Sequence, residues 1–302
     1  MGRVTSRRRV VRVVNGAASA RPDTLAAEEP LEIRVGGSAL SITMRTPGHD
    51  FDLAAGFLVS EGVVRSAEDI AGIRYCAGAT ADGSNTYNVL DVVLAAGVAP
   101  PDPSIERNFY MTSSCGLCGK ASLDAVRTVA PWTVAEDDVS LRPEVLAGLP
   151  DSLRAAQKVF DRTGGLHAAG LFTPAGELLC LREDVGRHNA VDKVVGWAVQ
   201  NGRLPLRGSI LQVSGRASFE LVQKAVMAGL PVLAAVSAPS SLAADLAEDS
   251  GMTLVGFSRG SSFNIYTGAE RVQLDDSGSG QSAPGESPVD ESAPALSAAA
   301  AD

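Results

Sequence analysis

The feature that most constrains the fold of this chain is an alternation of short apolar segments and helical patterns in its second half. Three apolar segments are separated by two segments with apolar residues at helical spacing, in the order 209–213, 219–228, 231–236, 241–248 and 252–256. Strands that are apolar throughout are buried on both faces, and helical connections join parallel strands. The sequence therefore predicts an α/β core with a mostly parallel sheet covered by helices on both faces.

The first third of the chain predicts a smaller α+β subdomain over residues 28–108. Its expected elements are strands with alternating polarity, joined by a Gly36-Gly37 hairpin, and one helix with Asp50 as N-cap; they are listed in chain order as 31–35, 40–46, 50–61 and 89–95. The run Pro100-Pro101-Asp102-Pro103 then breaks the chain. We place the boundary of the larger core, residues 109–272, after this run.

Further elements of the core are expected before and after the alternating segments at 209–256. They are a helix over 153–160, strands over 167–172 and 177–182, a helix from Asp184 as its cap to residue 200, and a last short strand over 263–266. Residues 1–27 are predicted to be a basic, Ala-rich lead-in. Residues 273–302 are rich in Ser, Ala, Pro and Gly, and we expect them to be a disordered acidic tail.

Charge and hydropathy narrow the classes of function. The net charge is −9, but six acidic residues and no Lys or Arg follow Arg271, which leaves −3 for the rest of the chain. Non-specific nucleic-acid binding is therefore not expected. No apolar run reaches the about 20 residues that a membrane-spanning helix needs. The segment around Arg7-Arg8-Arg9 resembles a twin-arginine export signal, but Arg12 interrupts the apolar run that follows, so we expect a cytoplasmic protein.

The chemistry-bearing feature of the sequence is a C-x-x-C loop at residues 112–120. Cys115 and Cys118 are surrounded by Gly and Ser, and Lys120 follows just before a helical pattern. A helix N-terminus and a nearby cation lower the pKa of a thiol, and small neighbours leave room for a partner sulfur. Cys115 is predicted to be the more exposed and reactive thiol, with Cys118 resolving or supporting it.

Three kinds of site fit this spacing. A structural zinc site needs two further ligands, and only the isolated Cys76 and Cys180 remain, so we expect no metal. A thiol–disulfide exchanger and a persulfide carrier both need an exposed nucleophilic cysteine. The spacing does not separate these last two. Cys76 and Cys180 are interpreted as small apolar core residues.

Four motifs together resemble the formate dehydrogenase accessory sulfurtransferase family, FdhD/NarQ. They are TSSCGLCGKAS at 112–122, REDVGRHNAVDK at 182–193, TMRTPGHD at 43–50 followed by AAGFL at 54–58, and GLHAA at 165–169. The resemblance runs in one order from about residue 29 to residue 271. It implies a cytidine-deaminase-like α/β/α core and a homodimer.

The resemblance also implies a function. Family members take sulfane sulfur from a cysteine desulfurase and pass it to the molybdenum cofactor of formate dehydrogenase, Mo-bis(molybdopterin guanine dinucleotide). The persulfide carrier maps onto Cys115 and its companion onto Cys118. The cofactor-binding segment maps onto Phe257, Ser258, Arg259, Gly260, Ser261 and Ser262. Independently, this segment follows a predicted parallel strand, and Arg259 is suited to pair with phosphate.

Two alternatives to the sulfurtransferase remain open, the thiol–disulfide exchanger and a cofactor-binding chaperone, as do the roles of several polar residues. A cofactor-binding chaperone without covalent sulfur transfer is compatible with the same motifs, whereas a base deaminase is excluded because His167-Ala168-Ala169 lacks the required Glu. His167 is interpreted as a structural histidine. Arg187, His188 and Asn189 near a helix start fit either ligand contacts or capping, and Arg216 is an anion-binding candidate.

Overall fold

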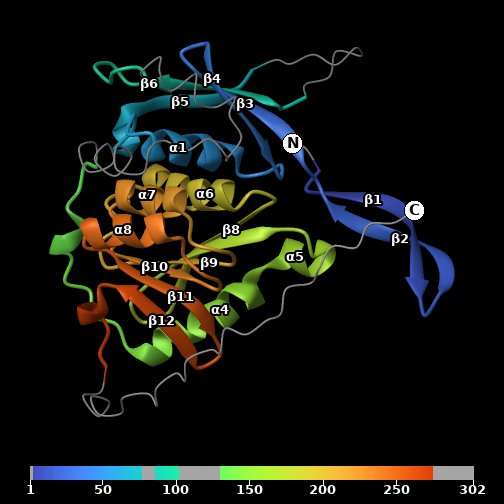
Figure 1. Cartoon of the computed structure of the whole chain (residues 1–302). Helices are drawn as coiled ribbons and strands as arrows, with labels where there is room; N and C mark the ends of the chain where they lie inside the picture. The colour runs from blue at the N-terminus through green and yellow to red at the C-terminus, as the bar shows by residue number, and fades with distance from the viewer. Residues whose placement is uncertain (1–2, 77–85, 102–129, 275–302) are drawn as a thin grey trace, which may run out of the picture.

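The large sheet has six strands in the order β12-β11-β10-β9-β7-β8 (Figure 1). The three apolar segments of the second half of the chain form its β9, β10 and β11. The computed structural model describes residues 3–76, 86–101 and 130–274. The strands are β7 (His167–Phe172), β8 (Leu178–Asp184), β9 (Ile210–Val213), β10 (Val232–Ala235), β11 (Thr253–Arg259) and β12 (Ser262–Thr267). Only β9, β10 and β11 run parallel; β12, β7 and β8 each pair antiparallel with their neighbours. The prediction of a mostly parallel sheet is therefore wrong: the sheet is mixed, because hairpins extend both of its edges.

Helices cover both faces of this sheet, as predicted for an α/β/α arrangement. Helices α6 (Arg187–Gln200), α7 (Phe219–Met227) and α8 (Ser241–Asp249) lie on one face, and α4 (Pro143–Ala156) and α5 (Lys158–Thr163) on the other (Figure 1). Successive strand residues alternate between two hydrophobic clusters. Leu211, Leu233 and Leu254 join the cluster with α6, α7 and α8. Ile210, Val232 and Val255 join the cluster with α4. Because successive side chains of a strand point to opposite faces, each of these strands contributes apolar side chains to the core on both sides of the sheet.

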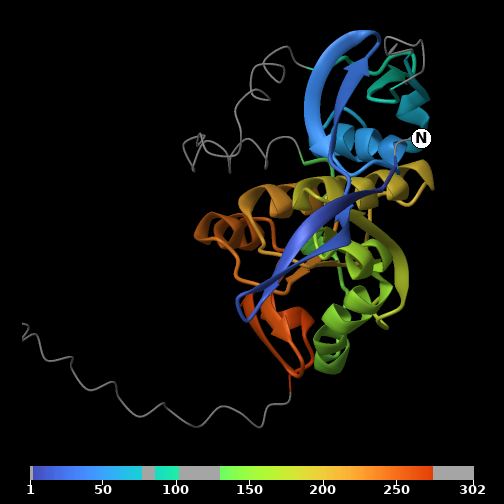
Figure 2. The ribbon, with the colours of Figure 1, turned by 90° about the vertical axis from the view of Figure 1, so that its right-hand side faces the viewer.

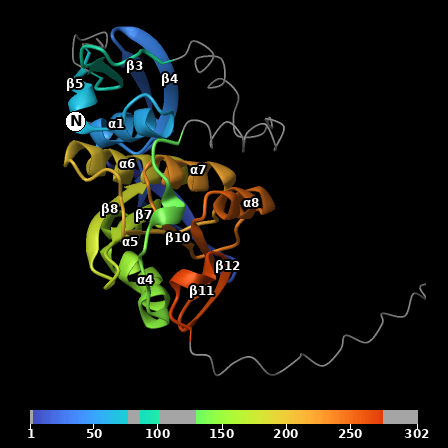
Figure 3. The same ribbon diagram turned by 90° about the vertical axis from the view of Figure 1, so that its left-hand side faces the viewer.

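The smaller sheet lies above α1 (Asp50–Ser60) and has the order β4-β3-β6-β5. Its strands are β3 (Glu29–Val35), β4 (Ser38–Arg45), β5 (Ile70–Tyr75) and β6 (Val89–Leu94). Three of these strands and the helix confirm the predicted elements, whereas β5 was not anticipated. Three single 3₁₀ turns complete the described structure: Ala67–Asp69, Val134–Glu136 and Ala269–Arg271. From top to bottom in Figures 1 and 3, the layers are this sheet, α1, the α6–α8 layer, the large sheet and α4–α5.

The predicted lead-in is an antiparallel hairpin. Strands β1 (Thr5–Val14) and β2 (Ala17–Ala26) pair over their full length. They project from the body in Figure 1 and run across the front of the molecule in Figure 2. Asn15 and Gly16 both have positive φ at the turn, which is the Asn-Gly chemistry of a two-residue hairpin. The Asn15-Gly16 dipeptide therefore indicated a hairpin in the sequence, but the segment was interpreted from its basic composition instead.

Three local predictions were wrong at helix boundaries. Asp50 is the first residue of α1 instead of its N-cap, because its carboxylate is held by Arg45 at 2.9 Å. Asp184 ends β8, and Gly186 is the N-cap of α6. The expected helix over 153–160 is instead two helices: α4 begins at Pro143, ten residues before the predicted start, and α5 begins at Lys158 after a break at Gln157. The sequence signals were Pro143 at the first helical position and apolar residues at helical spacing after it.

Helices α1 and α6 cross at very close range through a pair of glycines. A Cβ atom on Gly56 would overlap the backbone carbonyl of Asp192, and one on Gly196 would overlap that of Asp52. The two backbones touch here because neither glycine carries a side chain. This crossing joins the smaller sheet to the α6 layer of the large one.

We predict that Gly56→Ala and Gly196→Ala each destabilise the protein by at least ~3 kcal/mol, because the new methyl group forces the helices apart. Thermal unfolding followed by circular dichroism measures this as a loss of at least ~5 °C in Tm. Gly148→Ala in α4 is the matched control. Its Cβ meets open space, so a gain of ~0.5–1 kcal/mol is expected. Equal Tm values for all three variants would contradict the close crossing.

Candidate functional site

A cavity of about 640 Å³ opens at the carboxyl edge of the parallel strands; we call it the edge cavity. Ser214 follows β9, Val236 follows β10, and Ser258 lies near the end of β11. His167 joins them because β7 runs antiparallel to β9 and therefore begins at this edge. Open α/β sheets bind ligands at this edge, and the volume falls in the ~300–1,000 Å³ range of ligand pockets.

The far wall of the edge cavity comes from α4, α5 and the loop that follows them. Leu153, Arg154, Gln157 and Phe160 line it, with Gly164 and Gly165 beyond the helix end. The sequence did not reveal these lining residues, because the start of α4 and its break near Gln157 were placed wrongly. The spacing of Leu146, Leu149 and Leu153, all buried under the sheet, was the usable signal.

The six predicted cofactor residues lie at the tip of the β11–β12 hairpin. Ser258, Arg259 and Gly260 line the edge cavity, Ser261 and Gly260 line a neighbouring one, and Phe257 and Ser262 line neither. Ser258 is fully buried, and its hydroxyl donates to the carbonyl of Leu146 at 3.4 Å. The segment was expected to follow a parallel strand. Instead β11 extends through Arg259, and the tip is a tight turn with Gly260 at φ +53°.

Phe257 has an unusual backbone conformation. Its φ is +53°, a region that bulky residues rarely adopt. The strand pairing is irregular between Gly256 and Arg259, and the Phe257 N–H donates to the carbonyl of Ser237 at 3.2 Å. The aromatic side chain is left 43% exposed. Strain of this kind concentrates at functional sites, and here it turns an aromatic ring outward beside the edge cavity.

His167 is not the structurally satisfied histidine that its position in a strand suggested. Among the described residues, neither of its ring nitrogens has a hydrogen-bond partner, although the side chain lines the edge cavity. The ring packs against Gly215, whose ideal Cβ position lies 3.4 Å from Nδ1 of His167. Burial and the neighbouring Arg187 and His188 lower the pKa of His167. The free imidazole is therefore neutral near pH 7.

Three arginines at the same edge lack acidic partners. Within the described part of the chain, Arg187, Arg216 and Arg259 form no ion pair and donate no side-chain hydrogen bond. The Nε atom of Arg187 is buried and unsatisfied at the start of α6. Unpaired guanidinium groups in a chain of net charge −9 make this edge suited to anions.

The motif at residues 182–193 forms the junction between the two sheets. The Asp184 carboxylate accepts from Lys193 at 2.7 Å, and both side chains are buried. The two groups also bind the backbone of Thr46, Asp184 through the N–H and Lys193 through the carbonyl. Asn189 donates to the carbonyl of Met44 at 2.8 Å. Asn189, one of the residues left open by the sequence, is therefore a structural bridge from α6 to β4.

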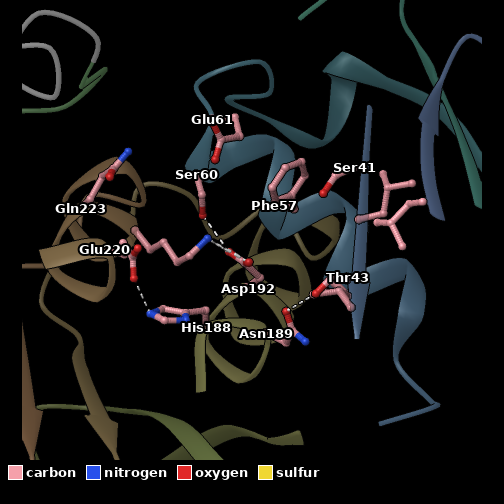
Figure 4. A pocket seen from close by; sticks show the side chains of 14 residues that line it. Ser41, Thr43, Phe57, Ser60, Glu61, His188, Asn189, Asp192, Glu220 and Gln223 are labelled. Carbon is pink, nitrogen blue, oxygen red and sulfur yellow. Dashed lines mark hydrogen bonds and ion pairs between the residues drawn. The ribbon is translucent and has the colours of Figure 1, made fainter. Parts of the chain in front are cut away.

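A second cavity of about 350 Å³ lies between the smaller sheet, α1, α6 and α7; we call it the interlayer cavity (Figure 4). At its centre Asp192 accepts from Lys224 at 2.8 Å and from the hydroxyl of Ser60 at 2.8 Å. His188 contacts Glu220 at 2.7 Å on the α7 side. The charged groups of the interlayer cavity are thus mostly paired with one another.

Glu61 differs from the other carboxyl groups of the interlayer cavity. No side-chain hydrogen bond to it is found among the described residues. Burial and the Asp192 carboxylate raise its pKa, against the opposing effect of Lys224. Glu61 also lines a further cavity, of about 430 Å³, that reaches Pro101.

Comparison with known proteins identifies the family. The model of the FdhD/NarQ family matches residues 26–273. The chain belongs to the FdhD/NarQ family. It is 70% identical over 275 residues to the sulfur carrier protein FdhD of Streptomyces avermitilis, covering 91% of this chain and 98% of that protein. It is 64% identical over 269 residues to the sulfur carrier protein FdhD of Mycolicibacterium paratuberculosis, covering 89% and 99%.

The fold of this FdhD/NarQ chain matches a solved structure. The crystal structure of a proposed formate dehydrogenase accessory protein from Desulfotalea psychrophila superposes with a TM-score of 0.69, over 89% of this chain and all of that one, at 24% identity. This likeness establishes a shared mixed α/β fold. The cytidine-deaminase-like assignment stays a prediction.

The cysteine pair of this FdhD/NarQ chain, Cys115 and Cys118, lies outside the described residues, as does the tail from residue 275. Of the other two cysteines, Cys76 follows β5 in the small sheet and Cys180 lies within β8 in the large one. Within residues 3–76, 86–101 and 130–274, no group of three His, Cys, Asp or Glu side chains is arranged to hold a metal ion. No helix in those ranges is long and apolar enough to cross a membrane.

We predict that Cys180 is inert toward thiol reagents in the folded protein. It is 5% exposed, and burial raises the pKa of its thiol to about 12, so almost no thiolate is present at pH 8. Iodoacetamide labelling followed by peptide mass spectrometry should find the Cys180 peptide unmodified until urea unfolds the chain. The unfolded protein is the control for intrinsic reactivity. Rapid labelling of Cys180 in the native state would contradict its assignment to the core.

Proposed function

We propose that this protein is a sulfur carrier for formate dehydrogenase. Family membership and the names of relatives at 64–70% identity support the sulfur-carrier assignment. The C-x-x-C loop supplies the thiol chemistry that a carrier needs. The proposal includes a cytoplasmic location, a cysteine desulfurase as sulfur donor, and a homodimer as the working form.

Cys115 is the proposed carrier thiol. Its thiolate attacks the outer sulfur of the desulfurase persulfide, so that one S–S bond forms on Cys115 while the donor S–S bond breaks and the donor thiolate leaves. Sulfur keeps its oxidation state in this exchange, and no further reactant is needed. Cys118, three residues on, is placed to release the outer sulfur as hydrosulfide by forming a disulfide with Cys115.

The proposed cargo is the molybdenum cofactor, Mo-bis(molybdopterin guanine dinucleotide), whose metal accepts the delivered sulfur. The observation that carries this part is the edge cavity, which three of the six predicted cofactor residues line. Its volume fits one nucleotide portion, with the rest of the cofactor extending outside. Arg259 supplies charge for phosphate, the Gly260 turn lets a ligand approach the backbone, and the exposed ring of Phe257 offers a surface for a base.

A cofactor-binding chaperone is the second candidate, since the edge cavity favours ligand binding without requiring sulfur chemistry. The reactive-thiol context of Cys115 favours the carrier. A thiol–disulfide exchanger is a weaker candidate, because it gives no reason for a nucleotide-sized cavity at the sheet edge.

To test the carrier proposal, the cysteines are substituted one at a time, and formate dehydrogenase activity is measured in cells that lack the native protein. Cys115→Ala should bind guanosine diphosphate as well as wild type and yet give no formate dehydrogenase activity above the deletion strain. Cys118→Ala should retain sulfur on Cys115 and deliver it poorly. Cys180→Ala is the matched control and should activate fully. Full activation by Cys115→Ala would establish the chaperone instead.

A further inference from the structure

The segment around Arg7-Arg8-Arg9, which resembled an export signal in the sequence, lies in the first strand of the β1–β2 hairpin. The family model matches from residue 26 onward, so this hairpin precedes the fold that the family shares. It projects from the body (Figure 1), and its residues line neither the edge cavity nor the interlayer cavity. A two-stranded hairpin alone in water is only marginally stable, so its exposed surface is suited to a partner.

The hairpin concentrates positive charge on an acidic protein. Residues 3–26 contain six Arg and one Asp, a net charge of +5, whereas the whole chain has −9. Five of these arginines lie on the two strands and are exposed: Arg7, Arg8, Arg9, Arg12 and Arg21. Within the described ranges, none of the five forms an ion pair or donates a side-chain hydrogen bond. Their charge is therefore available to an anionic partner.

The end of the hairpin, in contrast, is apolar and uncharged. Between Arg12 and Arg21 the chain reads VVNGAASA, which contains no charged residue. Val13 is 63% exposed and Val14 is 49% exposed, and Val11 just behind them is 68% exposed. Exposed apolar side chains gain free energy when a partner removes them from water. The partner of this tip therefore offers an apolar environment as well as negative charge.

Valines and arginines occur on both faces of the ribbon. Alternate residues of a strand point to opposite faces, so the regular register places Val14 and Arg12 on one face and Val13 and Arg9 on the other. A folded protein or a nucleic-acid duplex that packs on a ribbon covers one of its faces. A tip that is apolar all round, with arginines behind it on both faces, fits a medium that surrounds it on all sides. The interface of an anionic lipid bilayer is such a medium.

We propose that the β1–β2 hairpin docks on an anionic lipid surface. The valines of the tip enter the interface, and the arginines behind them contact lipid phosphates. The strands extend about 7 Å beyond Arg12, which matches the ~5–10 Å depth that interfacial segments reach. The outward-facing backbone groups of a two-stranded ribbon need water or headgroups, so the tip stays outside the hydrocarbon core. The contact is peripheral and reversible.

The length of the hairpin lets an acidic protein approach a negatively charged surface. Strands of ten residues span ~33 Å, whereas electrostatic interactions are screened over ~8 Å at physiological salt. The base of the hairpin is fixed to the body, where Arg162 of α5 donates to the hydroxyl of Thr5 at 3.4 Å. The N–H of Ala27 also donates to the carbonyl of Val4 at 2.9 Å. The arginines near the tip therefore meet the surface while the acidic body stays beyond the screening distance.

The test measures binding of the full-length protein to vesicles by co-sedimentation. Vesicles that contain phosphatidylglycerol should bind the protein, more weakly as salt is added, and vesicles of phosphatidylcholine alone should bind little. Arg12→Gln combined with Arg21→Gln should weaken binding to the anionic vesicles ~20-fold, because each Arg near such a surface contributes a factor of ~5. Arg65→Gln combined with Arg207→Gln is the matched control. It removes the same charge from exposed positions outside the hairpin and should bind like wild type.

A second variant tests the tip separately from the charge. Val13→Thr combined with Val14→Thr keeps the β-branched shape and the strand propensity of both side chains. The new hydroxyl groups are costly to remove from water, so binding to the anionic vesicles should weaken ~10-fold without a change in its salt dependence. Circular dichroism spectra and Tm values equal to those of wild type establish that each variant is folded.

Four results would overturn the proposal. The first is no binding of folded wild type to anionic vesicles at low salt, and the second is an equal loss of binding in the Arg65 and Arg207 control. The third is a dimer that dissociates in the Val13 and Val14 variant, in place of vesicle binding, which would assign the tip to a second copy of this chain. The fourth is duplex DNA bound as tightly as vesicles and unaffected by the valine substitutions, which would assign the hairpin to nucleic acid. None of these measurements depends on sulfur transfer by Cys115.

Discussion

The close crossing of α1 and α6 is the constraint on which the rest of this structure depends. Gly56 and Gly196 let the two backbones touch, and the buried Asp184–Lys193 pair seals the junction by binding both backbone groups of Thr46. Removing one partner of such a pair leaves a buried charge and typically costs ~3–5 kcal/mol. Because α6 is fixed between the two sheets, the position of Arg187 at its first turn is fixed as well.

This arrangement explains how an acidic chain keeps unpaired positive charge at one edge of its large sheet. The acidic groups near α6 are neutralised inside the molecule, Asp184 by Lys193 and Asp192 by Lys224. Within the described ranges, the side chains of Arg187, Arg216 and Arg259 at the carboxyl edge form no ion pair. The antiparallel start of β7 adds His167 to an edge that parallel strands alone would have lined with Ser214 and Val236. The mixed topology of the sheet therefore contributes directly to the site.

Much of the fold was predictable because β9, β10 and β11 are buried on both faces of the sheet, and such strands are apolar at almost every position of the sequence. The antiparallel hairpins at the sheet edges were harder, since pairing direction is decided by partners far away in sequence. The site was predictable only in part. The segment around Arg259 was predicted from a family resemblance, and three of its residues line the edge cavity. His167 was interpreted as a structural residue, because the sequence around a single histidine in a strand does not show which hydrogen-bond partners it lacks. The Asp184–Lys193 pair was hidden for the same reason: its role depends on Thr46, well over a hundred residues away.

In the proposed function, Cys115 carries sulfur for a cargo bound at the edge cavity. The most direct test is intact-protein mass spectrometry after incubation with a cysteine desulfurase and cysteine. We expect the added mass of one or more sulfur atoms, which a reductant removes and which maps to the Cys115 peptide. No added sulfur on folded protein with free thiols would contradict it.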